Sequence, residues 1–85
     1  MSTDQTKTLI ERYFTAFNAS DNEGMLGCLS EDVVHDINQG EREIGKDKFR
    51  WFLAMMDRHY REELSDIVIM TNQTGSRAAA EFTVR

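Results

Sequence analysis

The sequence predicts one small α+β domain, because its hydrophobic periodicity changes from helical to strand-like along the chain. Apolar residues in the first third recur at the i, i+3 and i+4 spacing of a helix face. A brief β-branched run follows, and the last third has two strand-like runs separated by a turn sequence. The chain of 85 residues contains no proline, no repeat and no linker-like stretch. We therefore expect a single domain over residues 1–85.

Two helices of four turns are predicted, at residues 3–18 and 46–60. The first carries on one face Leu9, Ile10, Tyr13, Phe14 and Phe17. The second carries on one face Phe49, Phe52, Leu53, Met56 and Tyr60. Between them, Ser20 and Glu23 have the spacing of a capping box, which predicts a short helix with Met25, Leu26 and Leu29.

The strands are predicted at residues 33–37, 64–70 and 77–85. Alternation places Val34 and Asp36 on one face of the first strand, and Val33, His35 and Ile37 on the other. Residues 72–75 form the turn of a hairpin between the last two strands. A two-stranded ribbon is marginal by itself, and the strand pattern continues to the last residue. We expect its missing partner to come from another chain or from sequence beyond Arg85, so that the domain is incomplete.

Composition excludes several classes of function. A net charge of −5 and a pI of 4.9 argue against a surface for nucleic acid or an anionic membrane. The chain has no apolar run close to the roughly 20 residues that span a bilayer. A single cysteine and a polar N-terminus without signal-peptide order predict a cytoplasmic protein. Histidine and cysteine lack the paired spacing of a metal site, so we expect no metal.

Two residues could carry chemistry. Asp36 sits in an apolar strand, where burial would raise its pKa towards that of a general base. The alternative is an edge strand from which Asp36 simply points at water. Tyr13 lies on the apolar face of the first helix, and a buried phenol can donate a hydrogen bond to an oxygen that gains charge during a reaction. The alternative is a core tyrosine bonded to a backbone carbonyl.

Residues 12–21 (RYFTAFNASD), a short helix and then residues 33–36 (VVHD) resemble the opening of the ketosteroid isomerase branch of the NTF2-like superfamily. That superfamily also contains SnoaL-type polyketide cyclases, and residues 35–46 look most like its ketosteroid isomerase-related proteins. The resemblance implies a cone-shaped α+β barrel, with a curved, mostly antiparallel sheet around the first helix and an apolar pocket between them. This chain has Ile37 where the family often has proline. The family's second oxyanion-hole acid, and about three further strands, would lie beyond Arg85.

The resemblance implies a ketosteroid isomerase-like enzyme that shifts a proton next to a carbonyl, with Asp36 as the base and Tyr13 as the donor to the enolate oxygen. No cofactor is expected, and the ligand would be a small apolar carbonyl compound. Alternatives are a SnoaL-type polyketide cyclase, and a non-catalytic ligand-binding or dimerisation domain. A homodimer is expected. The residues expected to line the substrate pocket are Phe17, Val34, Phe52, Met56, Phe82 and Val84.

Overall fold

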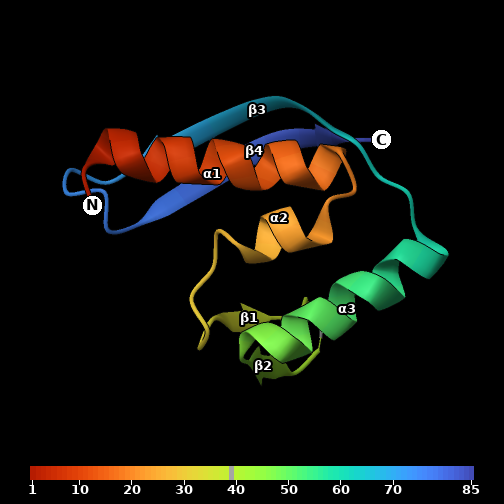
Figure 1. Cartoon of the computed structure of the whole chain (residues 1–85). Helices are drawn as coiled ribbons and strands as arrows, with labels where there is room; N and C mark the ends of the chain where they lie inside the picture. Colours follow the sequence, from red (N-terminus) through yellow and green to blue (C-terminus); the bar gives the residue numbers. More distant parts are fainter. Residues whose placement is uncertain (39) are drawn as a thin grey trace.

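The computed structural model describes residues 1–38 and 40–85 and confirms the mixed α+β class (Figure 1). Within these residues the strands form two separate antiparallel sheets, β1–β2 and β3–β4, where we expected one curved sheet. Gln39, which belongs to the turn predicted after the first strand, lies outside the described residues. The elements in chain order are α1 (Thr3–Asn18), α2 (Asn22–Leu26), β1 (Val34–Asp36), β2 (Arg42–Ile44), α3 (Lys46–His59), β3 (Leu64–Thr71) and β4 (Ala78–Val84).

Helix α1 begins at a capping box and is fastened there to the β3–β4 turn. The Ser2 hydroxyl accepts from the Gln5 backbone N–H at 3.1 Å, and the Gln5 side-chain oxygen accepts from the Ser2 N–H at 2.8 Å. These bonds satisfy backbone donors that helix geometry leaves unpaired. The Thr6 hydroxyl donates to the Gly75 carbonyl at 2.6 Å. The helix therefore lies along the hairpin, with its N-terminus at the turn (Figure 1).

Helix α2 begins one residue later than a cap at Ser20 would predict. The Asp21 carboxylate accepts from the Gly24 N–H at 2.9 Å, so Asp21 is the N-cap. Ser20 instead adopts a left-handed backbone, with φ of 56°, in the turn that reverses the chain after α1. The prediction of Ser20 as the cap is wrong, because two good capping residues are adjacent here and the turn uses the first.

Strand β2 is an element that the sequence analysis assigned to a loop. It has only three residues and pairs antiparallel with β1, so that Val34 lies opposite Ile44 and Asp36 opposite Arg42. Three residues, two of them charged, are too few to give a recognisable period-two pattern. This short hairpin contacts α3 through both of its strands.

The core lies where α1, α2 and α3 meet. Four buried side chains form it, two from each of α2 and α3, namely Met25, Leu26, Phe49 and Leu53. The partly buried side chains packed against this cluster are Tyr13, Ala16, Phe17, Leu29 and Phe52. On the other side of α1, the ring of Phe14 packs edge-on against Phe82 of β4, with centroids 5.6 Å apart. Helix α1 thus joins the three-helix core to the β3–β4 sheet.

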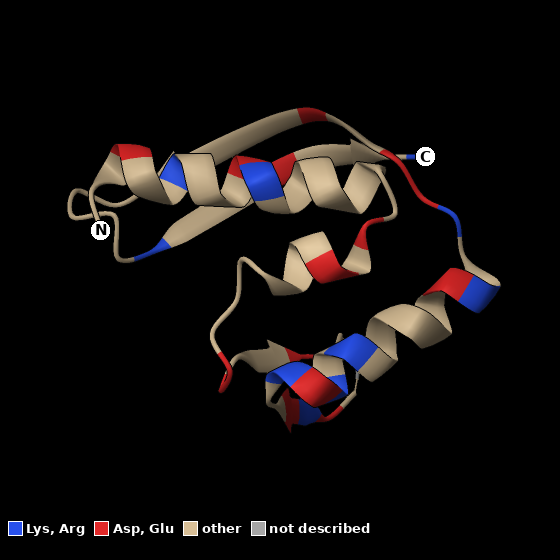
Figure 2. Ribbon diagram, in the orientation of Figure 1, with Lys and Arg blue, Asp and Glu red and all other residues tan. Residues whose placement is uncertain are grey.

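Charged side chains gather on α3 and on the β1–β2 hairpin, whereas β3 and β4 carry few (Figure 2). No helix in residues 1–38 and 40–85 has the length and apolar character needed to cross a bilayer.

Candidate functional site

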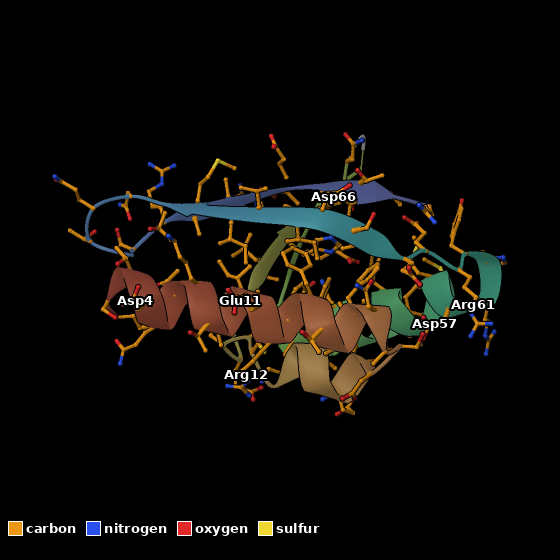
Figure 3. The ribbon with its side chains drawn as sticks, turned by 90° about the horizontal axis from the view of Figure 1, so that it is seen from above. Asp4, Glu11, Arg12, Asp57, Arg61 and Asp66 are labelled. Atoms are coloured by element: carbon orange, nitrogen blue, oxygen red, sulfur yellow. The ribbon has the colours of Figure 1, made fainter. Side chains whose placement is uncertain are left out.

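An apolar pocket of about 860 Å³ lies between α1, α3 and the end of β4. Its volume falls within the range of small-molecule sites, which are mostly apolar with a few polar groups. The aromatic side chains that line it are Tyr13, Phe14, Phe17, Phe52, Tyr60 and Phe82. The polar residues that line it come mainly from the end of α3 and the segment after it, where Asp57 and Arg61 lie close to one end of the molecule (Figure 3).

Five of the six residues predicted to line a substrate pocket border this one. They are Phe17 from α1, Phe52 and Met56 from α3, and Phe82 and Val84 from β4. These segments are far apart in the sequence and meet only because α1 packs on both α2 and β3, while α2 packs on α3. That these side chains contact a substrate stays a prediction.

Val34 lies outside the pocket, because β1 turns its other face towards α3. The His35 ring packs edge-on against Phe49 and Phe52, with centroids 4.8 and 4.7 Å away. Alternation then points Val34 away from α3, and its side chain is 50% exposed. The alternation predicted for this strand is confirmed, whereas Val34 is not among the residues that line this pocket.

Asp36 shares the outward face of β1 with Val34. Its carboxylate accepts two hydrogen bonds from Arg42 of β2, at 2.6 Å from Nε and 3.0 Å from Nη2. The side chain is 64% exposed, and the hydrogen bonds from Arg42 lower its pKa. The raised pKa of a buried carboxyl, expected from the apolar strand, is therefore not found. The strand-edge alternative describes this geometry, because the carboxylate is exposed and paired with Arg42 on the outward face of β1.

Tyr13 lies in the wall of the pocket, on the inner face of α1. Burial raises the pKa of its phenol, and the nearby Cys28 thiol raises it further. The phenol consequently keeps its proton at neutral pH and above, so it can act as a hydrogen-bond donor. None of the side-chain hydrogen bonds within residues 1–38 and 40–85 involves its hydroxyl, in contrast to the core-tyrosine alternative, and the hydroxyl is not among the buried polar atoms that lack a partner, so it is open to the pocket. Tyr13 is part of the pocket wall and Asp36 is not, so the two are not brought together there.

The sequence analysis predicted no functional role for His35. The structure places its ring against Phe49 and Phe52 of α3. Its Nδ1 is buried and has no hydrogen-bond partner among the described residues. A buried polar atom without a partner is uncommon in folded proteins and needs a physical reason. One signal pointed to this face of β1: Val33 and Ile37 flank His35 on it, whereas Asp36 makes the opposite face more polar.

The described part of the chain holds no group of three or more His, Cys, Asp or Glu side chains placed to bind a metal ion. Among the polar rim residues, the Asp57 carboxylate is already occupied, since it accepts from the Asn22 amide at 2.7 Å.

A comparison with protein families matches residues 10–85 to the SnoaL-like domain. The chain belongs to the SnoaL-like family. The match includes the second half of α1, the pocket and both hairpins, and it agrees with the NTF2-like resemblance of the sequence. No curated protein matches the chain.

Three solved structures are similar to this SnoaL-like chain, and each is described as a candidate polyketide cyclase. The protein from Pseudomonas putida KT2440 is 56% identical, with a TM-score of 0.89, over 99% of this chain and 61% of its own. The protein from Xanthomonas campestris pv. campestris is 45% identical, with a TM-score of 0.95, over 99% and 62%. The protein from Silicibacter sp. TM1040 is 53% identical, with a TM-score of 0.89, over 93% and 58%. The chain thus spans 58–62% of the length of these relatives.

Proposed function

We propose that this SnoaL-like protein binds an apolar carbonyl compound and moves a proton at the carbon next to the carbonyl. The observation that carries the proposal is Tyr13, a protonated phenol without a protein partner in the wall of an apolar pocket of small-molecule size. In such a site the natural partner for a phenol is the oxygen of a bound ligand. The resemblance of residues 12–21 to ketosteroid isomerases and the similarity to candidate cyclases both support carbonyl chemistry.

The proposed step needs a base and a hydrogen-bond donor and no cofactor. The base takes a proton from the carbon next to the carbonyl, and the electron pair moves onto the carbonyl oxygen. A hydrogen bond from Tyr13 strengthens as that oxygen gains charge, so it stabilises the transition state more than the bound ketone. Returning the proton to another carbon completes an isomerisation. Attack of the enolate carbon on a second carbonyl instead forms the new bond of an aldol ring closure, as in a cyclase.

Asp36 is the base that the family resemblance implies. In this structure its carboxylate is held by Arg42 on the outward face of β1, so it must leave that ion pair before it can accept a proton from a substrate. An Asp36→Asn variant tests the assignment, because it keeps the shape and removes the base. Exchange that continues undiminished in Asp36→Asn would show that another group is the base.

The experiment is deuterium exchange at the α-carbon of β-tetralone, an apolar enolisable ketone, followed by proton NMR in D₂O. We expect the protein to exceed the buffer rate, and Tyr13→Phe to lower its rate by about a hundredfold because one oxyanion donor is lost. Tyr60→Phe is the matched control, since Tyr60 also borders the pocket but is 61% exposed.

Ketone binding without exchange above the buffer rate would favour the alternative, a non-catalytic ligand-binding domain. That alternative takes support from the position of Asp36 outside the pocket.

We also propose that the protein self-associates through the face of β3–β4 that points away from α1. Val68 and Met70 are 49% and 45% exposed there, and Met70 lies opposite Ala79. The ribbons of this sheet carry few charges (Figure 2), and an exposed apolar face is stabilised when a second copy covers it. Light scattering should give a dimer for the protein and a monomer for Met70→Glu. Met55→Glu, on α3, should leave the dimer intact.

A further inference from the structure

A second hollow, of about 320 Å³, lies between α1, the segment after α2 and the start of β4. Its walls are mostly apolar side chains of α1 and the loop, two of them aromatic, and its floor is the alanine run of residues 78–80. No charged residue of the described chain lines it. A cavity with such walls suits hydrocarbon and disfavours hydroxyl or charged groups, which would lose their hydration without gaining a partner.

This hollow adjoins the proposed ketone pocket. Tyr13 and Phe14, neighbours on α1, line both of them. Cys28 lines the smaller hollow, and its thiol is close enough to the Tyr13 phenol to influence that group's ionisation. Tyr13 and Cys28 therefore both border the smaller hollow. The two hollows are thus neighbours along α1, with Tyr13 bordering both.

We propose that the smaller hollow is a subsite for the aliphatic tail of an elongated ketone. The ring system of the ligand lies in the larger pocket, its carbonyl meets Tyr13, and an unbranched alkyl chain lies along residues 78–80. The small side chains of Ala78 and Ala80, which share the face of β4 opposite to that of Ala79, leave the space that the alkyl chain occupies, whereas the larger pocket, walled by aromatic rings, suits a flat ring system. This inference rests on the ketone-binding part of the proposed function, but it does not require turnover.

Two fluorescent ketones test the tail subsite by their length. The propionyl and hexanoyl derivatives of dimethylaminonaphthalene share one ring body and differ by three methylene groups. We expect the hexanoyl ketone to bind at least about tenfold more tightly, because its additional methylenes leave water. Equal affinities would overturn the proposal.

Two variants test whether the preference for the longer ketone comes from the tail subsite or from general hydrophobic binding. Ala80 is half-buried in the floor, so Ala80→Leu should fill the hollow and abolish the advantage of the longer ketone while the propionyl ketone binds as before. Ala54→Leu is the matched control, because Ala54 is exposed on α3 and lines neither hollow. A chain-length advantage that persists in Ala80→Leu would overturn the proposal.

Chemical modification of Cys28 tests the proposal in the unsubstituted protein. This test remains valid if Ala80→Leu fails to fold. It is the single cysteine of the chain and is partly exposed. A saturating hexanoyl ketone should slow its modification by methyl methanethiosulfonate, followed by intact mass, and a saturating propionyl ketone should not. Equal rates with both ketones would overturn the tail subsite. A hexanoyl ketone that binds and protects Cys28 but undergoes no α-exchange would contradict the proposed catalysis alone, and binding of neither ketone would overturn both proposals.

Discussion

Asn18 and Leu64 exchange two hydrogen bonds across 46 residues of sequence. The Asn18 amide donates to the Leu64 carbonyl at 2.9 Å, and its side-chain oxygen accepts from the Leu64 N–H at 2.8 Å. The side chain thereby pairs with a strand backbone as a neighbouring strand would. It fixes the last residue of α1 against the first residue of β3, and Leu64 is part of the pocket wall.

Replacing Asn18 by alanine should lower the free energy of unfolding by about 1–3 kcal/mol, because the partly buried N–H and C=O of Leu64 lose their partner. Chemical denaturation in urea measures this. Gln73→Ala, in the exposed β3–β4 turn, is the control and should change stability by less than about 0.5 kcal/mol. An Asn18→Ala protein as stable as the parent would show that water replaces the amide at no cost.

Because Nδ1 of His35 is buried without a partner, we expect His35→Phe to stabilise the protein. Phenylalanine keeps an aromatic ring against Phe49 and Phe52 and removes a buried polar atom, so stability should rise by about 1 kcal/mol. Thermal unfolding measures it, with the exposed His59→Phe as the control. If α-exchange falls while stability rises, His35 serves the reaction. A loss of stability would instead mean that Nδ1 has a partner in solution, such as water.

The ion pair of Asp36 and Arg42 predicts how the stability of the fold depends on pH. Because Arg42 lowers the pKa of Asp36 in the folded protein, the ion pair stabilises the fold above the ordinary carboxyl pKa of 3.8. That contribution disappears as the pH falls through the lowered value.

Arg42→Gln should move the Asp36 titration to higher pH, which carbon-detected NMR of the carboxyl group measures directly. Arg50→Gln is the control, because Arg50 pairs with Glu23 and Asp47 instead. An unchanged Asp36 midpoint in Arg42→Gln would show that the ion pair is not populated in solution.

Gly75 occupies a position that no other residue fits. Its φ is +75°, and a Cβ there would lie 2.7 Å from the Ser2 backbone. Gly75→Ala should therefore cost about 2 kcal/mol or more in urea unfolding. Gly27→Ala is the matched control. Gly27 has a right-handed φ of −63°, and the atom nearest to a Cβ added there would be 3.4 Å away. Equal stabilities of the two variants would contradict the close contact between the turn and α1.

The long elements could be predicted from sequence because their signals are local. Helix α1 has the bounds predicted, residues 3–18, since its apolar period and the polar residues that follow both act within a few residues. The β3–β4 hairpin was also predicted, from its turn and its alternating runs. Strand β2 was missed because its three residues form a strand only through pairing with β1. A pairing of that kind leaves no periodic trace in the sequence.

The sequence by itself determined the α+β class, the helix faces and the alternation of β1, because each follows from periodicity along one segment. Only the tertiary structure decided which face of β1 turns inwards, since Phe49 and Phe52 select His35 by packing on it. That choice left Asp36 to Arg42 and the solvent, away from the pocket that Tyr13 lines. Alternation fixes which residues share a face, but the choice of the buried face depends on the element that packs against it.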